Sequence, residues 1–191
     1  MDTSAEGHQP TDPKSMRALA HPTRLRLLAE LRIRGPQTVG LLSDILGEPV
    51  GGVSYHLGQL ATHHLVEEVP ELARDRRERW WKAAHPRTVL GPADGADDPQ
   101  RAEASQALRH AIIQRYLDLL ERYLDSESSL GKRWANNAVS SDATLHLTPE
   151  QLGELKGELE EVAARWEERG NRDTPGTQPV VLMYHAFRRP Q

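Results

Sequence analysis

The sequence contains no cysteine, which excludes disulfide bonds, thiolate metal ligands and a cysteine nucleophile. This favours a reducing compartment, the cytoplasm. The sequence also lacks an apolar run near the roughly 18 residues of a membrane-spanning helix. Its beginning, MDTSAEGHQPTDPK, is polar and acidic, unlike a signal peptide. We therefore expect a cytoplasmic protein with no membrane partner.

Catalytic motifs are absent as well. The sequence has no phosphate-binding loop, no Gly-x-Gly-x-x-Gly, no Gly-x-Ser-x-Gly and no His-Glu-x-x-His. We therefore expect neither an enzyme nor a bound cofactor. The 191 residues, of which 37% are hydrophobic, suffice for one full-sized domain or two small ones.

Charge is distributed unevenly along the chain, whose net charge is -4. Residues 1–91 hold 12 Lys and Arg against 11 Asp and Glu, whereas residues 92–191 hold 12 against 17. Because the location of charge matters more than its total for nucleic-acid binding, the overall acidity does not exclude a polyanionic partner. Four arginines cluster in the first half: Arg74, Arg76, Arg77 and Arg79.

Residues 51–65, GGVSYHLGQLATHHL, predict a helix with two different faces. At 100° per residue one side is apolar, comprising Val53, Leu57, Leu60 and Leu65. The other side has no carboxylate and comprises Gly51, Tyr55, Gly58, Gln59 and Thr62. Mid-helix glycine costs about 0.5 to 1 kcal/mol relative to alanine, which indicates a partner close to the backbone. A polyanion fits this face; the alternative is a core helix with a solvated back, which normally carries Glu and Lys.

Two helices are expected before this one. Pro22 is suited to the first position of a helix over PTRLRLLAELRI, which Gly35-Pro36 ends. Thr38 can cap the next helix, VGLLSDIL, which stops at Gly47. A short link then leads to the helix that starts near Val50, which is the layout of a helix-turn-helix.

After Leu65 the pattern alternates, and the loop ELARDRRE separates two short strand-like segments. We interpret this as a hairpin with a basic tip. A hairpin in this position is a wing, whose tip commonly contacts the phosphate backbone or the minor groove. Solvated loop arginines are the alternative.

Four segments together carry a resemblance: LAHPTRLRLLAEL, TVGLLSDILG, VSYHLGQLATHHLVEE and the hairpin ending RWWKA. Over about residues 14–85 the chain resembles the winged helix-turn-helix domain of ArsR-family transcriptional regulators. The resemblance implies a homodimeric, sequence-specific DNA-binding regulator, a repressor or an activator, with the helix from Val50 in the major groove. By position it implies base contacts from Ser54 and Tyr55 and DNA contacts from the arginines of the wing.

The sequence departs from the family in three respects. Pro49 stands where a Ser or Thr cap is usual, and Gly51-Gly52 leaves fewer side chains to read bases. The thiolate metal site of metal-sensing members has no counterpart, and no pair of His and carboxylate ligands near His110 replaces it. We expect no metal site, and we interpret His56 as a boundary residue bonded to the backbone.

The remaining chain begins with a Pro/Gly/Asp-rich linker over residues 86–99. Residues 100–126 predict one long helix with a broad apolar stripe that includes Leu108, Ile112 and Leu119. In the resembling family the helix after the wing contributes to the dimer interface; the alternative is packing within the chain.

Strand, helix and strand follow. Residues 142–147 alternate as a strand, Thr148 and Gln151 predict a capping box for a helix that stops at Gly170, and residues 179–187 predict a second strand. Four aromatic residues here could line a pocket for a small apolar or aromatic effector: Trp134, Trp166, Tyr184 and Phe187.

The expected fold class is mainly α with small β elements, comprising a winged helix-turn-helix, a long dimerisation helix and a small C-terminal α+β unit. The expected division is a flexible arm (residues 1–13), the DNA-binding domain (14–85), the linker (86–99) and a dimerisation or effector domain (100–191). The expected DNA contacts are Gly51, Ser54, Tyr55, Gln59, Thr62, Arg74, Arg76, Arg77 and Arg79. The expected partners are a near-palindromic double-stranded operator, a second copy and a small effector. The rivals are a winged-helix protein-interaction module without DNA binding and a small-molecule enzyme in the C-terminal unit.

Overall fold

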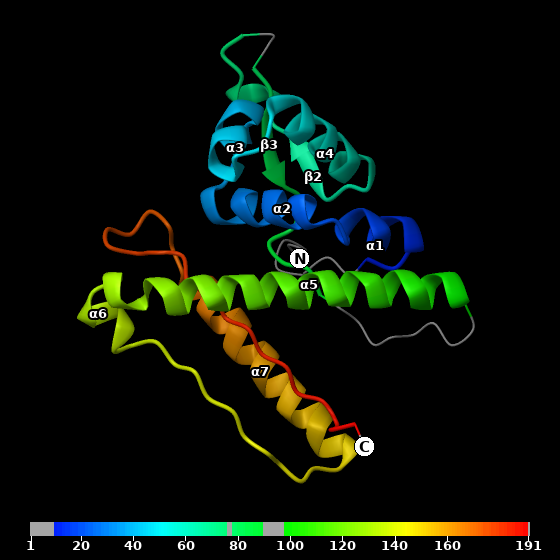
Figure 1. The fold of residues 1–191 in the computed structure, drawn as a ribbon, viewed down its shortest axis with the longest axis vertical. Coiled ribbons are helices and arrows are strands. Elements are labelled where there is room, and N and C mark those ends of the chain that lie inside the picture. The colour runs from blue at the N-terminus through cyan, green and yellow to red at the C-terminus, as the bar shows by residue number, and fades with distance from the viewer. Residues whose placement is uncertain (1–9, 76–77, 90–97, 191) are drawn as a thin grey trace. The chain divides into compact units, whose positions relative to one another are not determined.

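The computed structural model describes residues 10–75, 78–89 and 98–190 (Figure 1). The chain divides into two compact units, residues 1–124 and 125–191, which are described separately. The boundary falls inside the segment 100–191 that the sequence suggests as one domain. Most of the expected N-terminal arm and linker lies outside the described residues. No helix in the described part of the chain is both long enough and apolar enough to cross a membrane.

Four helices open the described part of the first unit, and the last three lie where the sequence punctuation predicts. They are α1 (Pro13–Leu19), α2 (Pro22–Arg34), α3 (Val39–Leu46) and α4 (Val50–Thr62). Proline occupies a first-turn position of both α1 and α2, where the backbone N–H has no partner within the helix. Helix α2 ends at Gly35, whose φ of 76° is in the range that favours glycine.

A small antiparallel sheet completes the winged fold. Its strands are β1 (Gln37–Thr38), β2 (Val66–Glu68) and β3 (Trp80–Ala83), in the order β1-β3-β2. Strands β2 and β3 form the hairpin that the sequence predicts, and the 3-10 helix η2 (Pro70–Leu72) begins the connection between them. Helix α3, the turn and α4 thus stand beside a wing, which confirms the winged helix-turn-helix.

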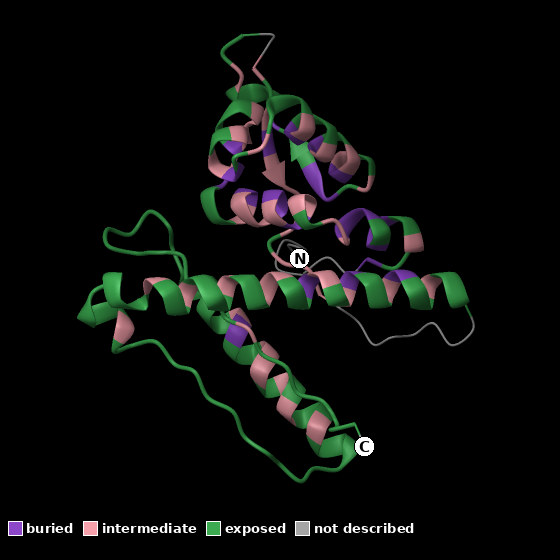
Figure 2. Ribbon diagram, viewed as in Figure 1, coloured by how far each residue is buried: buried purple, intermediate pink, exposed green. Residues whose placement is uncertain are grey.

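One apolar core holds this unit together. Helices α2 and α4 and strand β3 each contribute to it, and the helix α5 (Pro99–Ser126) adds its buried side (Figure 2). The largest side chains with almost no exposure are Leu19, Leu27, Leu28, Leu31, Leu42, Leu57, Leu60, Leu65, Leu108 and Val53. Burial of each such leucine stabilises the fold by about 1.5 to 3 kcal/mol, so this core fixes how α4 is presented.

Helix α5 (Pro99–Ser126) is the long helix expected after the linker. Its N-terminal half packs on the core through Ala104, Leu108 and Ile112. The side chain of Arg32 in α2 holds the segment that precedes α5 by two hydrogen bonds. Its Nε donates to the carbonyl oxygen of His85 and its Nη2 to the Thr88 hydroxyl, each at 3.0 Å. Burial lowers the pKa of Arg32 to about 10.

The second unit contains the 3-10 helix η3 (Glu127–Ser129), the short α6 (Lys132–Ala135) and α7 (Pro149–Arg169). The expected capping box begins α7. The Thr148 hydroxyl accepts the N–H of Gln151 at 3.2 Å, and the Gln151 side chain accepts the N–H of Thr148 at 3.0 Å. This part of the sequence prediction is confirmed.

The two strands expected beside α7 do not form. Residues 142–147 and 179–187, all of them described, belong to no strand and are extended or irregular. Alternating β-formers make a strand only when another strand accepts their backbone hydrogen bonds, and the described part of the chain offers these segments no such neighbour. The C-terminal unit therefore consists of one capped helix, two short ones and unpaired segments.

Candidate nucleic-acid interface

Helices α3 and α4 are joined by a tight turn that sets the start of α4. Thr38 caps α3 as predicted, because its hydroxyl accepts the N–H of Leu41 at 3.2 Å. At the other end, the N–H groups of Gly47 and Glu48 both donate to the carbonyl oxygen of Ser43, at 2.9 and 3.2 Å. Gly47 has a φ of 68°, which favours glycine. Helix α4 then begins after Pro49, which provides no side-chain cap.

Helix α4 has one buried side and one open side. Val53, Leu57 and Leu60 have no exposed surface. The open side carries most of the residues expected to contact DNA: Gly51, Ser54, Tyr55 and Thr62 are exposed, and Gln59 is half-buried. Tyr55 is 61% exposed, the most of any aromatic residue in the first unit.

The glycines of α4 are not required by packing within the chain. A Cβ atom at Gly51, Gly52 or Gly58 would meet no atom within 4 Å. Each therefore weakens the helix without relieving a contact inside the protein. Together with the absence of acidic residues from α4, this leaves a smooth, carboxylate-free surface onto which a polyanion can come close to the backbone.

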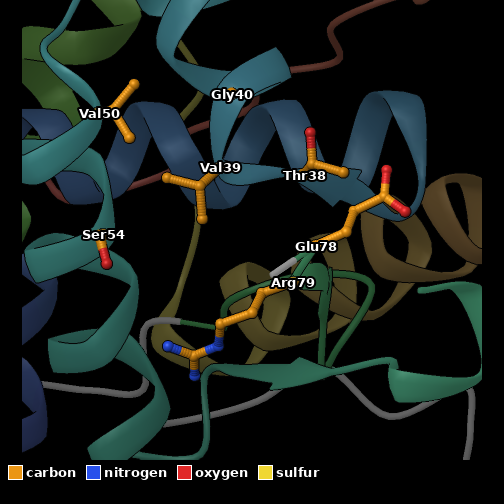
Figure 3. Close-up of a pocket in the computed structure, with 7 residues that line it drawn as sticks. All are labelled: Thr38, Val39, Gly40, Val50, Ser54, Glu78 and Arg79. Atoms are coloured by element: carbon orange, nitrogen blue, oxygen red, sulfur yellow. The ribbon is translucent and has the colours of Figure 1, made fainter. Parts of the chain in front are cut away.

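A hollow lies along one edge of this surface (Figure 3). Val50 and Ser54 line it from α4, Thr38, Val39 and Gly40 from the start of α3, and the acidic Glu78 and the basic Arg79 from the wing. Ser54 thus lies at the edge that faces the wing. Elements that are distant in sequence meet here, which periodicity alone does not predict.

The wing arginines are not equivalent. Arg79 donates from Nε and Nη2 to the two carboxylate oxygens of Glu68, at 2.8 and 2.9 Å. Its guanidinium also lies 4.8 Å from the centre of the Trp81 ring. The hydrogen bonds from Arg79 lower the pKa of Glu68 and raise that of Arg79. Arg79 thus braces the hairpin.

Of the other three arginines, the structure describes Arg74. Arg74 is exposed, and its backbone N–H donates to the Glu78 carboxylate at 2.9 Å. Arg76 and Arg77 lie outside the described residues. Their roles as DNA contacts stay predictions.

On the other side of α4, aromatic rings cluster against the start of α2. The sequence analysis did not predict this cluster. The ring of His21 lies 4.5 Å from that of His56, and the ring of Tyr55 lies 5.3 Å from that of His56. The Nδ1 atom of His56 is buried and has no hydrogen-bond partner, so a backbone bond through this atom is excluded. The HPTR segment was the one local signal for this cluster. Sequence alone could not predict the contact of His21 with His56, because these residues are far apart in the chain.

The four aromatic residues expected to line an effector pocket in the second unit are exposed. Trp134, Trp166, Tyr184 and Phe187 are all at least 39% exposed. The Arg169 guanidinium covers one of them, 4.7 Å from the centre of the Trp166 ring. An effector site at these residues stays a prediction. In the described chain, no three His, Asp or Glu side chains gather as metal ligands do.

The winged fold and the carboxylate-free helix define a DNA-binding class of protein, and comparison with known families agrees. Residues 19–69 match the family model of a helix-turn-helix domain, which covers α2, α3 and α4. Comparison with curated proteins gave no match. The match covers less than half of the chain. It supports a DNA-binding regulator rather than an enzyme.

Proposed function

We propose that the chain is a sequence-specific transcriptional regulator of the ArsR type that binds DNA as a homodimer, with α4 in the major groove. The observation that carries this is the open side of α4. It has glycines that no internal contact requires, no carboxylate, and hydrogen-bonding side chains at Ser54, Tyr55 and Gln59. A major-groove reader needs these features, because it must approach the bases closely without repelling phosphate.

The homodimer is supported by α5. Beside its buried side it exposes apolar residues at spacings of four, three and four, namely Ile113, Leu117, Leu120 and Leu124. This is the heptad pattern by which one helix packs on another. A two-fold dimer predicts a near-palindromic operator with half-sites about one helical turn apart.

The α5 stripe can be tested directly. We expect Leu117→Asp to convert the dimer to a monomer in light scattering, because a charge there opposes burial of the stripe. Leu72→Asp, an exposed leucine outside α5, is the control and should leave the mass unchanged. Equal masses for Leu117→Asp and the unsubstituted protein would exclude α5 as the interface.

Repression and gating by an effector complete the proposal. A dimer on an operator that overlaps a promoter blocks transcription, so deleting the gene should raise expression from that promoter in a reporter assay. A fall in expression instead would identify an activator.

For the effector, small aromatic compounds should change both tryptophan fluorescence and operator affinity, and Trp166→Leu should remove the response.

The rival, a protein-interaction module, is favoured by the pairing of charges on the wing strands. Arg79 pairs with Glu68, and Lys82 pairs with Glu67 at 2.9 Å. Operator titrations at two salt concentrations separate the two functions. A regulator binds DNA in a salt-dependent way with preference for its operator, whereas an interaction module binds neither operator nor unrelated DNA.

A further inference from the structure

The open side of α4 has two edges. Ser54 and His56 are two positions apart, which is about 200° around a helix with 3.6 residues per turn. Ser54 lines the hollow beside the wing, whereas the ring of His56 lies 4.5 Å from that of His21, the N-cap residue of α2. Tyr55 lies between the two edges on the open side.

The α2 edge has hydrogen-bond donors that find no acceptor among the described residues. The Nε atom of Arg24 is buried without a hydrogen-bond partner, although the residue as a whole is only half-buried. His21 caps α2, because its Nδ1 atom accepts the N–H of Thr23 at 3.2 Å. Neutral His21 then carries its proton on Nε2, so this atom is a donor.

Positive charge exceeds negative charge around this edge. No carboxylate of the described residues pairs with Arg24, and the charge of Arg24 helps to lower the pKa of both histidines, after burial. Glu48 is the acid whose charge acts on both histidines in the opposite sense. It is shared with Arg26, whose Nη1 lies 3.8 Å from a Glu48 oxygen. An anion would offset the excess positive charge and accept a hydrogen bond from Nε2 of His21.

We propose that Arg24, His21 and His56 form a phosphate-binding subsite that holds the DNA backbone at the edge of the major groove opposite the wing. A helix in the groove has a phosphate strand on each side, and phosphate contacts fix its register and orientation. The wing edge would contact the phosphates of one DNA strand, and this cluster would contact those of the other. The subsite rests on the proposed function and adds to it a second anchor, which orients Tyr55 toward the bases.

The first test compares operator affinity over a range of salt concentrations, using the full chain and DNA from upstream of its own gene. Arg24→Ala should weaken binding by about tenfold and lower the slope of log K against log salt by about 1, with sequence preference unchanged. Arg24→Lys should restore most of the slope, since it keeps the charge. Arg122→Ala, an exposed arginine on α5, is the control and should leave the slope unchanged.

The experiment distinguishes failure of the DNA-binding function from failure of the phosphate-binding subsite. If the unsubstituted protein shows no specific, salt-dependent binding, the DNA-binding function itself is wrong. If it binds and Arg24→Ala keeps the same slope while its thermal unfolding is unchanged, the subsite is wrong and the function stands.

A second test uses the histidines and does not depend on Arg24. A phosphate beside them raises their pKa in the complex, so binding takes up protons and tightens as the pH falls from about 7.5 to about 6. The double variant His21→Asn, His56→Gln should lose this dependence, while Asn keeps the α2 cap. An unchanged pH dependence in the double variant would overturn the subsite.

Discussion

The two units of this chain use apolar residues in opposite ways. In the first unit, leucines on five helices and Trp81 of the sheet are buried in one continuous core. In the second, Ala163 is the one buried residue among those described. Most of the large apolar residues there are exposed instead, with Val139 at 89% and Phe187 at 72%.

This difference teaches where the stability of the protein resides. Burial of apolar surface contributes about 25 cal/mol per Å², and single helices or unpaired segments are marginal in water without it. The first unit can therefore hold its fold, and the orientation of α4, through its own contacts. The second unit contributes little to the free energy of unfolding by contacts within itself.

The largest expected effect is a contrast between two leucines. Leu57→Ala in α4 should lower the free energy of unfolding by about 2 to 5 kcal/mol, because it leaves a cavity in a closed core. Leu182→Ala, at an exposed position of the second unit, should change it by less than about 0.5 kcal/mol. Urea denaturation of both variants measures this, and similar losses would contradict the contrast.

Removing the second unit is expected to have a smaller effect. A chain that ends at Ser126 keeps α5 whole and every residue of the core, so its free energy of unfolding should stay within about 1 kcal/mol. Thermal and urea unfolding of the two chains provide the comparison. A collapse of stability in the shortened chain would mean that the second unit supports the first.

The glycines of α4 separate stability from binding. Gly58→Ala should stabilise the protein by about 0.5 to 1 kcal/mol, because alanine favours the helix and a Cβ there meets no atom within 4 Å. It should also weaken DNA binding, because that Cβ occupies the space the DNA needs. Gly153→Ala in α7 is the matched control, since its Cβ also meets nothing within 4 Å. It should stabilise α7 and leave DNA affinity unchanged.

The smallest expected effect is the dependence of stability on pH that the Glu68–Arg79 pair produces. Arg79 lowers the pKa of Glu68 from 4.5, so the pair stabilises the wing above that pH. The contribution is lost as the pH falls through the lowered pKa. Because the pair is largely exposed, the loss is a small fraction of the total stability. Urea unfolding at a series of pH values measures this. Glu68→Gln should reduce the change in the free energy of unfolding between about pH 5 and 2, whereas the control Glu154→Gln should leave that change as it is.

Local signals predicted the helices well. Proline at Pro22, the left-handed glycine at Gly47 and the capping box at Thr148 each act within a few residues, so the sequence is sufficient to place them. The apolar stripe of α4 likewise predicted its buried side, because periodicity determines which residues share a face.

What the sequence did not predict depends on partners distant in the chain. The segments 142–147 and 179–187 have strand-like residues, but pairing needs a neighbour that alternation does not reveal. Arg79 looked like the other wing arginines, yet the cross-strand register places Glu68 within its reach. The contact of His21 with His56 likewise depends on how α2 crosses α4.

The most direct test of the central claim is a binding measurement. The purified protein is titrated with DNA from upstream of its own gene, against unrelated competitor DNA, at two salt concentrations. A DNA-binding regulator binds the upstream DNA in preference to the competitor, and its affinity falls steeply with salt. Binding to neither DNA, even at low salt, would contradict the account and leave the winged domain as a protein-interaction module.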